Sequence, residues 1–184
     1  MKKLLTKSIL VILTSSSFVA CKKETVTEPQ REEETVVTAG PGQNEFTQRG
    51  PGGSIVIYSG WINKTEPDWS GIGTHEIQTS LTAPSLSDDI VNKGVVLVYF
   101  DHFGTIKPMP NVWLEGVNSM VMDFSFVKQK ITLKLRTGGT SLLGIVDIPF
   151  RYVLIPGTNS GGRMNAPVDY TDYNAVCNYY GIAK

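Results

Sequence analysis

The residue types that most often carry chemistry are few in this 184-residue chain and lie far apart in it. Its two histidines, His75 and His102, each lack a second ligand at i+2 or i+4, a spacing typical of metal sites. Asp101 directly precedes His102, but neighbouring side chains on a strand point to opposite faces. The spacing therefore indicates neither a metal site nor an acid–base pair at either histidine.

Motifs for nucleophiles and phosphates are also missing. The chain has no G-x-S-x-G elbow, and its glycine-rich stretches are not followed by Lys-Ser/Thr. Asp88 and Asp89 suit the positive N-terminal end of a short helix. A carboxylate pair for glycoside hydrolysis depends on separations that a sequence does not contain, so an envelope hydrolase stays open as a second alternative. The sequence predicts a non-enzymatic protein with no catalytic residue, cofactor or metal.

Three tryptophans could contact a ligand, because indole rings stack on sugars. Trp61 and Trp113 lie in predicted strands, where we expect them to fill the core. Trp69 lies in a Pro/Gly-rich loop over residues 64–73, which makes it the candidate ligand contact. A carbohydrate-binding module would need Trp69 and a neighbouring aromatic residue in a flat exposed strip. The competing interpretation is that Trp69 folds back over one end of the domain as a lid.

The amino-terminal residues have the layout of a cleaved export signal. Lys2, Lys3 and Lys7 form a cationic region before a short apolar stretch over residues 8–20. That stretch is too short to span a bilayer, which takes about 20 apolar residues. The sequence ends this segment with Phe18-Val19-Ala20-Cys21, which resembles a lipobox, although Leu is usual at the first position. The alternative is an ordinary signal peptide followed by an incidental cysteine.

Cleavage at this site would make residues 1–20 a signal peptide and Cys21 the lipidated first residue of the mature chain. Acyl chains contribute about 0.8 kcal/mol per buried CH₂, and more than one chain gives stable attachment. We therefore expect a membrane partner through the lipid on Cys21, at the cell outer membrane, with the protein facing the periplasm or the surface.

Composition limits the other partners. Loss of Lys2, Lys3 and Lys7 leaves 14 of the 17 Lys and Arg residues against 17 Asp and Glu, a net charge of −3. This balance lacks the basic excess of nucleic-acid-binding proteins, so no nucleic-acid partner is predicted. Cys177 is then the remaining thiol, which excludes an internal disulfide. Cys177 falls on the apolar stripe of a short amphipathic helix predicted near the carboxyl end, so we expect it to be buried and inert.

Residues 21–53 are predicted to form a flexible tether, because they are rich in Glu, Thr, Gln, Gly and Pro and contain almost no large apolar residue except Phe46. The segments Gly40-Pro41-Gly42 and Gly50-Pro51-Gly52-Gly53 give this spacer a collagen-like composition. A collagen triple helix needs Gly at every third position, and that register fails at once.

Residues 54–184 are predicted to form one all-β domain, an antiparallel β-sandwich or jelly-roll-like fold with one short C-terminal helix. Residues 119–127 and 131–136 alternate apolar and polar side chains and should form a hairpin with one wet face. Residues 95–101 are apolar on both faces and should lie at a sheet centre. Pro149 should place the start of the last strand at an edge or bulge.

The lipobox, the Gly/Pro-rich spacer and a β-domain with the segments Ile57-Tyr58-Ser59-Gly60-Trp61 and Phe150 to Gly157 together resemble a family of small Bacteroidetes lipoproteins, often collagen-like. The resemblance covers nearly the whole chain and rests on structural strands, so it implies no catalytic residue. The missing Gly repeat departs from the collagen-bearing members and argues against trimerisation through the stalk.

The leading hypothesis is a membrane-anchored cell-envelope lipoprotein whose β-sandwich has a structural or interaction role. It predicts no deep polar pocket and scattered carboxylates. Its partner would be a glycan or a protein at the envelope, and the oligomeric state, including a trimer, stays open. The first alternative is the carbohydrate-binding module that uses exposed aromatic side chains.

Overall fold

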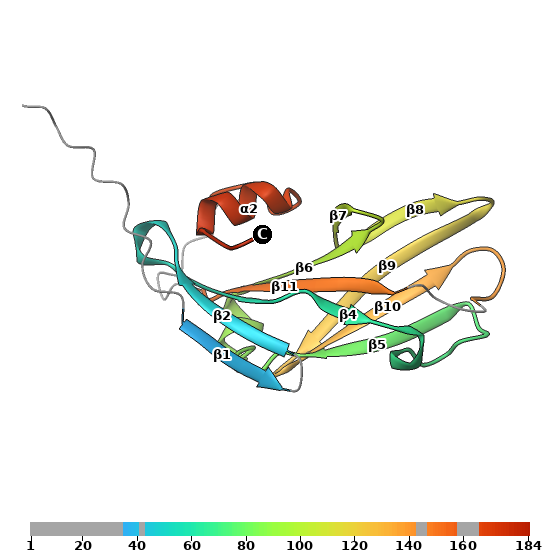
Figure 1. Cartoon of the computed structure of the whole chain (residues 1–184), viewed down its shortest axis with the longest axis horizontal. Helices are drawn as coiled ribbons and strands as arrows, with labels where there is room; N and C mark the ends of the chain where they lie inside the picture. The colour runs from blue at the N-terminus through green and yellow to red at the C-terminus, as the bar shows by residue number, and fades with distance from the viewer. Residues whose placement is uncertain (1–34, 41–42, 143–146, 158–165) are drawn as a thin grey trace, which may run out of the picture. The chain divides into compact units, whose positions relative to one another are not determined.

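The computed structural model describes residues 35–40, 43–142, 147–157 and 166–184, which belong to one compact unit. Two antiparallel sheets pack face to face, and two short α-helices complete the unit (Figure 1). The prediction of an antiparallel all-β sandwich with a short C-terminal helix is confirmed.

The larger sheet has seven strands in the order β1-β2-β3-β11-β6-β7, and β4 also pairs with β11. Strands that are consecutive in sequence pair at both edges of this sheet, β3 and β11 lie at its middle, and β6 lies between β11 and the edge strand β7. Its strands are β1 (Thr35–Gly40), β2 (Gln43–Arg49), β3 (Ile55–Ser59), β4 (Ile62–Lys64), β6 (Val95–His102), β7 (Thr105–Pro108) and β11 (Ile148–Ile155).

The smaller sheet has four strands in the order β5-β10-β9-β8. The predicted hairpin is present: Val127 pairs with Lys130, and Leu133 and Leu135 alternate with polar residues to face the core. This alternation follows from the two-residue period of a strand with one buried face. The strands are β5 (Glu76–Thr82), β8 (Asn111–Glu115), β9 (Asn118–Val127) and β10 (Lys130–Thr137).

The larger sheet is buried on both faces. One hydrophobic cluster fills the space between the sheets, and a second lies between the other face of the larger sheet and α2 (Tyr173–Tyr180). β6 accordingly contributes Val98 and Phe100 to the first cluster and Tyr99 to the second. The apolar character of residues 95–101 on both faces thus corresponds to an interior strand buried on both sides, next to the edge strand β7.

Helix α2 follows the predicted period. Val176 and Cys177 are buried against the larger sheet, and burial raises the pKa of the Cys177 thiol, as expected for an inert cysteine. Asp172 caps the helix by accepting a hydrogen bond from the Ala175 N–H at 3.0 Å. The helix ends at Gly181, whose left-handed φ of 71° suits glycine.

Arg151 of β11 attaches the carboxyl-terminal segment to the larger sheet. Only 5% of this residue is exposed, and its guanidinium donates to the Tyr173 hydroxyl and to the Ala183 carbonyl oxygen, both at 2.6 Å. It also donates to the Ser59 carbonyl oxygen at 2.9 Å and lies 5.3 Å from the Trp61 ring centroid. These partners satisfy a buried cation without a carboxylate.

The predicted tether is partly wrong, because the sheet begins well before residue 54. β2 pairs with β3 over five registered residue pairs from Glu45↔Ser59 to Arg49↔Ile55. Phe46 stacks on Tyr58 with the ring centroids 5.3 Å apart. The polar composition gave no sign of this strand, because backbone pairing and one partly buried aromatic ring hold it in place. The Gly/Pro segment after Arg49 is a turn, η1 (Pro51–Gly53), rather than a spacer. Residues 21–34, Cys21 included, lie outside the described residues.

Short elements elsewhere fit their sequence signals. Ser87 caps α1 (Asp88–Lys93) by accepting from the Ile90 N–H at 3.3 Å, and Asp88 and Asp89 occupy its first turn as predicted.

Pro149 lies just before β11 begins to pair with β6, so its missing N–H interrupts no bond on that side. Within the described ranges, no helix has both the length and the apolarity to cross a membrane.

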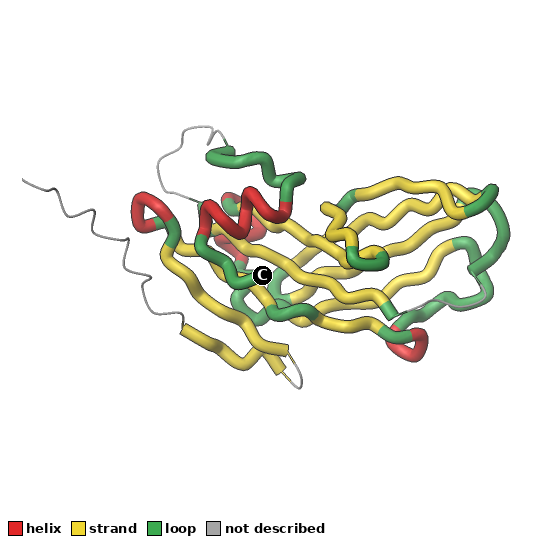
Figure 2. Tube along the Cα trace, turned by 45° about the horizontal axis from the view of Figure 1, so that its top comes forward, coloured by secondary structure: helices red, strands yellow, loops and turns green. Residues whose placement is uncertain are grey.

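The two sheets are not matched in length. In Figures 1 and 2, the β8–β9 hairpin and the end of β10 extend beyond the β6–β7 turn and the start of β11. The inner face of this overhang is therefore left without a covering strand from the larger sheet.

Candidate functional site

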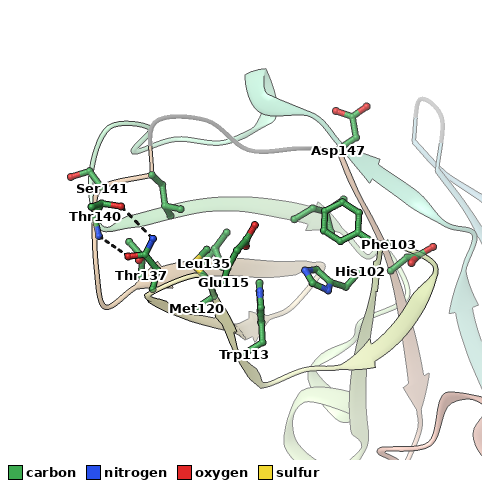
Figure 3. Close-up of a pocket in the computed structure, with 14 residues that line it drawn as sticks. His102, Phe103, Trp113, Glu115, Met120, Leu135, Thr137, Thr140, Ser141 and Asp147 are labelled. Carbon is green, nitrogen blue, oxygen red and sulfur yellow. Dashed lines mark hydrogen bonds between the residues drawn. The ribbon is translucent and has the colours of Figure 1, made fainter.

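A cleft of about 330 Å³ lies at the overhanging end of the sandwich. The smaller sheet contributes inward-facing side chains of β8, β9 and β10, and the larger sheet contributes the end of β6, its turn to β7 and the start of β11. The floor is apolar and consists of Met120, Leu135, Leu142 and Ile148. In Figure 3, Trp113 and Met120 of the smaller sheet face His102 and Phe103 of the larger sheet, and Asp147 and Ser141 lie at the rim.

Three aromatic rings form one side of the cleft. The His102 ring centroid lies 5.1 Å from that of Trp113 and 4.8 Å from that of Phe103. Phe103 is 76% exposed, which is unusual for so large an apolar side chain. The indole N–H of Trp113 is buried and has no hydrogen-bond partner among the described residues.

The turn that presents Phe103 is strained. Phe103 and Gly104 join β6 to β7 as a two-residue loop, and both have positive φ, 52° and 81°. Such loops favour Asn-Gly, because a bulky residue is disfavoured in the left-handed region. Asp101 supports the turn by accepting a hydrogen bond from the Gly104 N–H at 2.6 Å. A strained, exposed aromatic residue beside a cleft is a reason to look for a function there.

Carboxylates line the cleft without any Lys or Arg among the described lining residues. Asp101 is engaged in the turn, and Asp147 accepts a hydrogen bond from the Asn63 side-chain amide at 3.3 Å. Glu115 is exposed, and its carboxylate forms no hydrogen bond or ion pair with any residue that the structure describes. Three carboxylates thus lie around one apolar-floored cleft, because the overhang gathers residues from separate strands.

The wall opposite the aromatic rings is held by side-chain hydrogen bonds. The side-chain amide of Asn118, at the start of β9, donates to the Thr140 hydroxyl at 3.4 Å. The side-chain oxygen of the same amide accepts from the Thr140 N–H at 3.1 Å (Figure 3). Thr137 accepts from the Gly139 N–H at 3.1 Å. These bonds fix the loop after β10 against the β8–β9 hairpin and give the cleft one rigid wall.

Trp69, the predicted ligand contact, is not exposed. Only 6% of the residue is accessible, and its ring packs against Phe150 with the centroids 6.1 Å apart. The prediction of an exposed strip at Trp69 is therefore wrong, and the side chain instead covers the core as a lid. Trp61 is partly buried in the cluster under α2, as expected, whereas Trp113 both packs on the core and lines the cleft.

One of the two histidines lines the cleft. His75 is exposed in the loop before β5 and does not line the cleft, whereas His102 does. No hydrogen bond joins His102 to a carboxylate within the described ranges. In the same ranges, no three His, Cys, Asp or Glu residues are grouped to hold a metal ion. The arrangement offers stacking surfaces and hydrogen-bonding groups rather than a prepared acid–base pair.

Sequence reasoning missed the cleft residues Phe103, Trp113 and Glu115. Trp113 and Glu115 are two residues apart on one strand and so share a face, and Phe-Gly stands at a hairpin position that usually holds Asn-Gly. Both signals are present in the sequence. Comparisons with protein-family models, curated proteins and solved structures each gave no match.

Proposed function

We propose that this protein is a cell-envelope lipoprotein, anchored through Cys21, whose β-sandwich domain binds a ligand in the cleft at its overhanging end. The observation that carries the binding function is the exposed Phe103 ring, held in a strained turn beside a hollow with unpaired polar groups. A solvent-exposed aromatic ring and an unsatisfied donor are both costly to a protein that does not use them.

Binding is favoured over hydrolysis by the state of the polar groups. The carboxylates of Asp101 and Asp147 already accept hydrogen bonds from their own neighbourhood, and the His102 ring lies against the rings of Phe103 and Trp113. A general base needs an imidazole or carboxylate within hydrogen-bonding reach of the group it activates. The proposed role is therefore that of a non-catalytic module that holds an envelope component or a nutrient near the membrane.

The anchor rests on the lipobox-like segment and on the resemblance to small Bacteroidetes lipoproteins. The test is expression of the full chain and of Cys21→Ala in a bacterium with lipoprotein processing. The parent should fractionate with the outer membrane and incorporate radioactive palmitate, and the variant should do neither. Palmitate-free parent protein in the cytosol would overturn the proposed location.

The binding function is tested on the non-acylated mature chain, residues 22–184. A fragment library containing sugars, amines, carboxylic acids and apolar compounds is screened by ligand-observed NMR, and hits are repeated on Phe103→Ala. We expect hits whose binding weakens in that variant while Trp69→Phe leaves it unchanged. A screen without such hits would contradict the binding function.

A further inference from the structure

The cleft presents a hydrogen-bond donor and an acceptor side by side. Trp113 and Glu115 share the inward face of β8, since side chains two apart on a strand point the same way. In Figure 3 the indole nitrogen of Trp113 is directed toward the middle of the cleft, where Glu115 extends from the same strand. The nitrogen is buried without a partner among the described residues, and the Glu115 carboxylate is likewise unpaired there.

The Trp113 indole N–H and the Glu115 carboxylate together restrict which ligands can bind between them. A ligand atom between them must accept a hydrogen bond from the indole N–H and donate one to the carboxylate. A hydroxyl does both, whereas an ammonium only donates and a carboxylate or phosphate only accepts. Anionic ligands are further disfavoured, because Asp101, Glu115 and Asp147 line the cleft and no described lining residue is Lys or Arg.

The aromatic side of the cleft favours ligands that also have an apolar face. Phe103 offers an exposed apolar ring whose edge contact with His102 fixes its position at the rim. A pyranose combines an apolar C–H face, which stacks on such a ring, with hydroxyls around its edge. The volume of about 330 Å³ is near the lower end of the range for ligand pockets, roughly 300–1,000 Å³. One or two sugar rings therefore suit the space better than a long chain.

We propose, on the basis of the binding function above, that the cleft binds a neutral saccharide. One sugar face stacks on Phe103, and one hydroxyl accepts from the Trp113 indole N–H and donates to the Glu115 carboxylate. Glu115 is exposed and not held by any described residue, so its side chain can turn to admit the sugar oxygen. Binding then satisfies an indole N–H that has no hydrogen-bond partner among the described residues.

The test uses the non-acylated mature chain, residues 22–184, and three classes of probe. These are methyl glycosides of neutral hexoses and N-acetylhexosamines, spermidine as a polyamine, and glucuronate as an anion. Saturation-transfer NMR identifies binders, and titration gives their dissociation constants. We expect binding by at least one neutral glycoside and none by glucuronate. Binding of spermidine alone would overturn the saccharide inference and leave the binding function intact; no binder of any class would count against both.

Matched variants locate the bound sugar. Trp113→Phe removes the indole N–H but keeps an aromatic ring, and Glu115→Ala removes the carboxylate acceptor. Each substitution should weaken glycoside binding about tenfold, which is the loss expected for one hydrogen bond to a buried or charged partner. Glu66→Ala, an exposed acid away from the cleft, and Trp69→Phe should change nothing. Unchanged affinity in both cleft variants, with native NMR spectra, would overturn the proposed bridge.

Discussion

The Glu45 carboxylate accepts a hydrogen bond from the Tyr152 hydroxyl at 2.8 Å, joining β2 to the central strand β11 across 107 residues of sequence. Glu45 is fully buried, and it also accepts from the N–H of Ser85 at 3.2 Å and from its hydroxyl at 2.5 Å. Glu45 thus accepts hydrogen bonds from three donors in the protein interior, although its segment has the composition of a flexible tether.

Glu45→Ala should destabilise the domain by about 3 kcal/mol, because it removes the acceptor of both Ser85 donors and leaves the Tyr152 hydroxyl with the longer bond to the Thr82 carbonyl oxygen, at 3.3 Å. Glu45→Gln keeps one acceptor oxygen and should lose less. Urea unfolding of the non-acylated mature chain, followed by circular dichroism, measures both changes. If residues 44–53 were a flexible tether, neither substitution would move the unfolding midpoint.

Phe103→Asn should raise the free energy of unfolding by about 1 kcal/mol, because Asn tolerates the left-handed conformation that strains Phe103. The same substitution should weaken ligand binding, since it removes the exposed ring. Urea unfolding and ligand titration on one preparation check both effects. A variant that is less stable than the parent would show that the Phe103 ring serves the fold rather than the cleft.

Trp69→Ala should cost about 3–5 kcal/mol of stability, as expected for deleting a large buried aromatic side chain. Trp69→Phe should cost much less, because the Trp69 indole N–H makes no hydrogen bond to any described residue. Urea unfolding of both variants measures these losses, and the midpoint of Trp69→Ala should lie well below that of Trp69→Phe. Loss of sugar binding in a folded Trp69→Phe variant would restore the exposed-platform hypothesis.

Stability should fall above pH 10. Burial, the largest cause, raises the pKa of Tyr173 from 10.0 to about 12, and burial also raises the pKa values of Tyr99, Tyr152 and Tyr180. Between pH 10 and 12 the unfolded chain loses these protons while the folded chain keeps them. The unfolded state then binds fewer protons, so the free energy of unfolding decreases with pH. Urea midpoints measured from pH 8 to 12 should be constant up to about 10 and then decline; a flat profile would contradict the buried state of these hydroxyls.

Sequence patterns that lie within a single strand or helix predicted the fold well. Leu133 and Leu135 face the core because a strand repeats every two residues, and Val176 and Cys177 are buried because a helix repeats every 3.6. Ser87 likewise caps the helix that its sequence position indicates. Each of these outcomes depends on local geometry, which a sequence contains.

The errors depend on contacts between distant segments. β2 is held by backbone pairing with β3 and by a carboxylate whose donors come from residues 85 and 152, so its own composition gives no sign of burial. The cleft arises because one sheet is longer than the other, a property of strand pairing rather than of any single strand. Trp113 was assigned to the core for the same reason: its position in a strand is visible in the sequence, but the missing cover above it is not.

The hydrogen bonds from Arg151 have a practical consequence for handling the protein. The guanidinium holds the Ala183 carbonyl oxygen, one residue before Lys184 ends the sequence. A purification tag fused after Lys184 would emerge beside this buried cation and compete with the docking of the final turn. Tags and surface attachments belong instead ahead of β1.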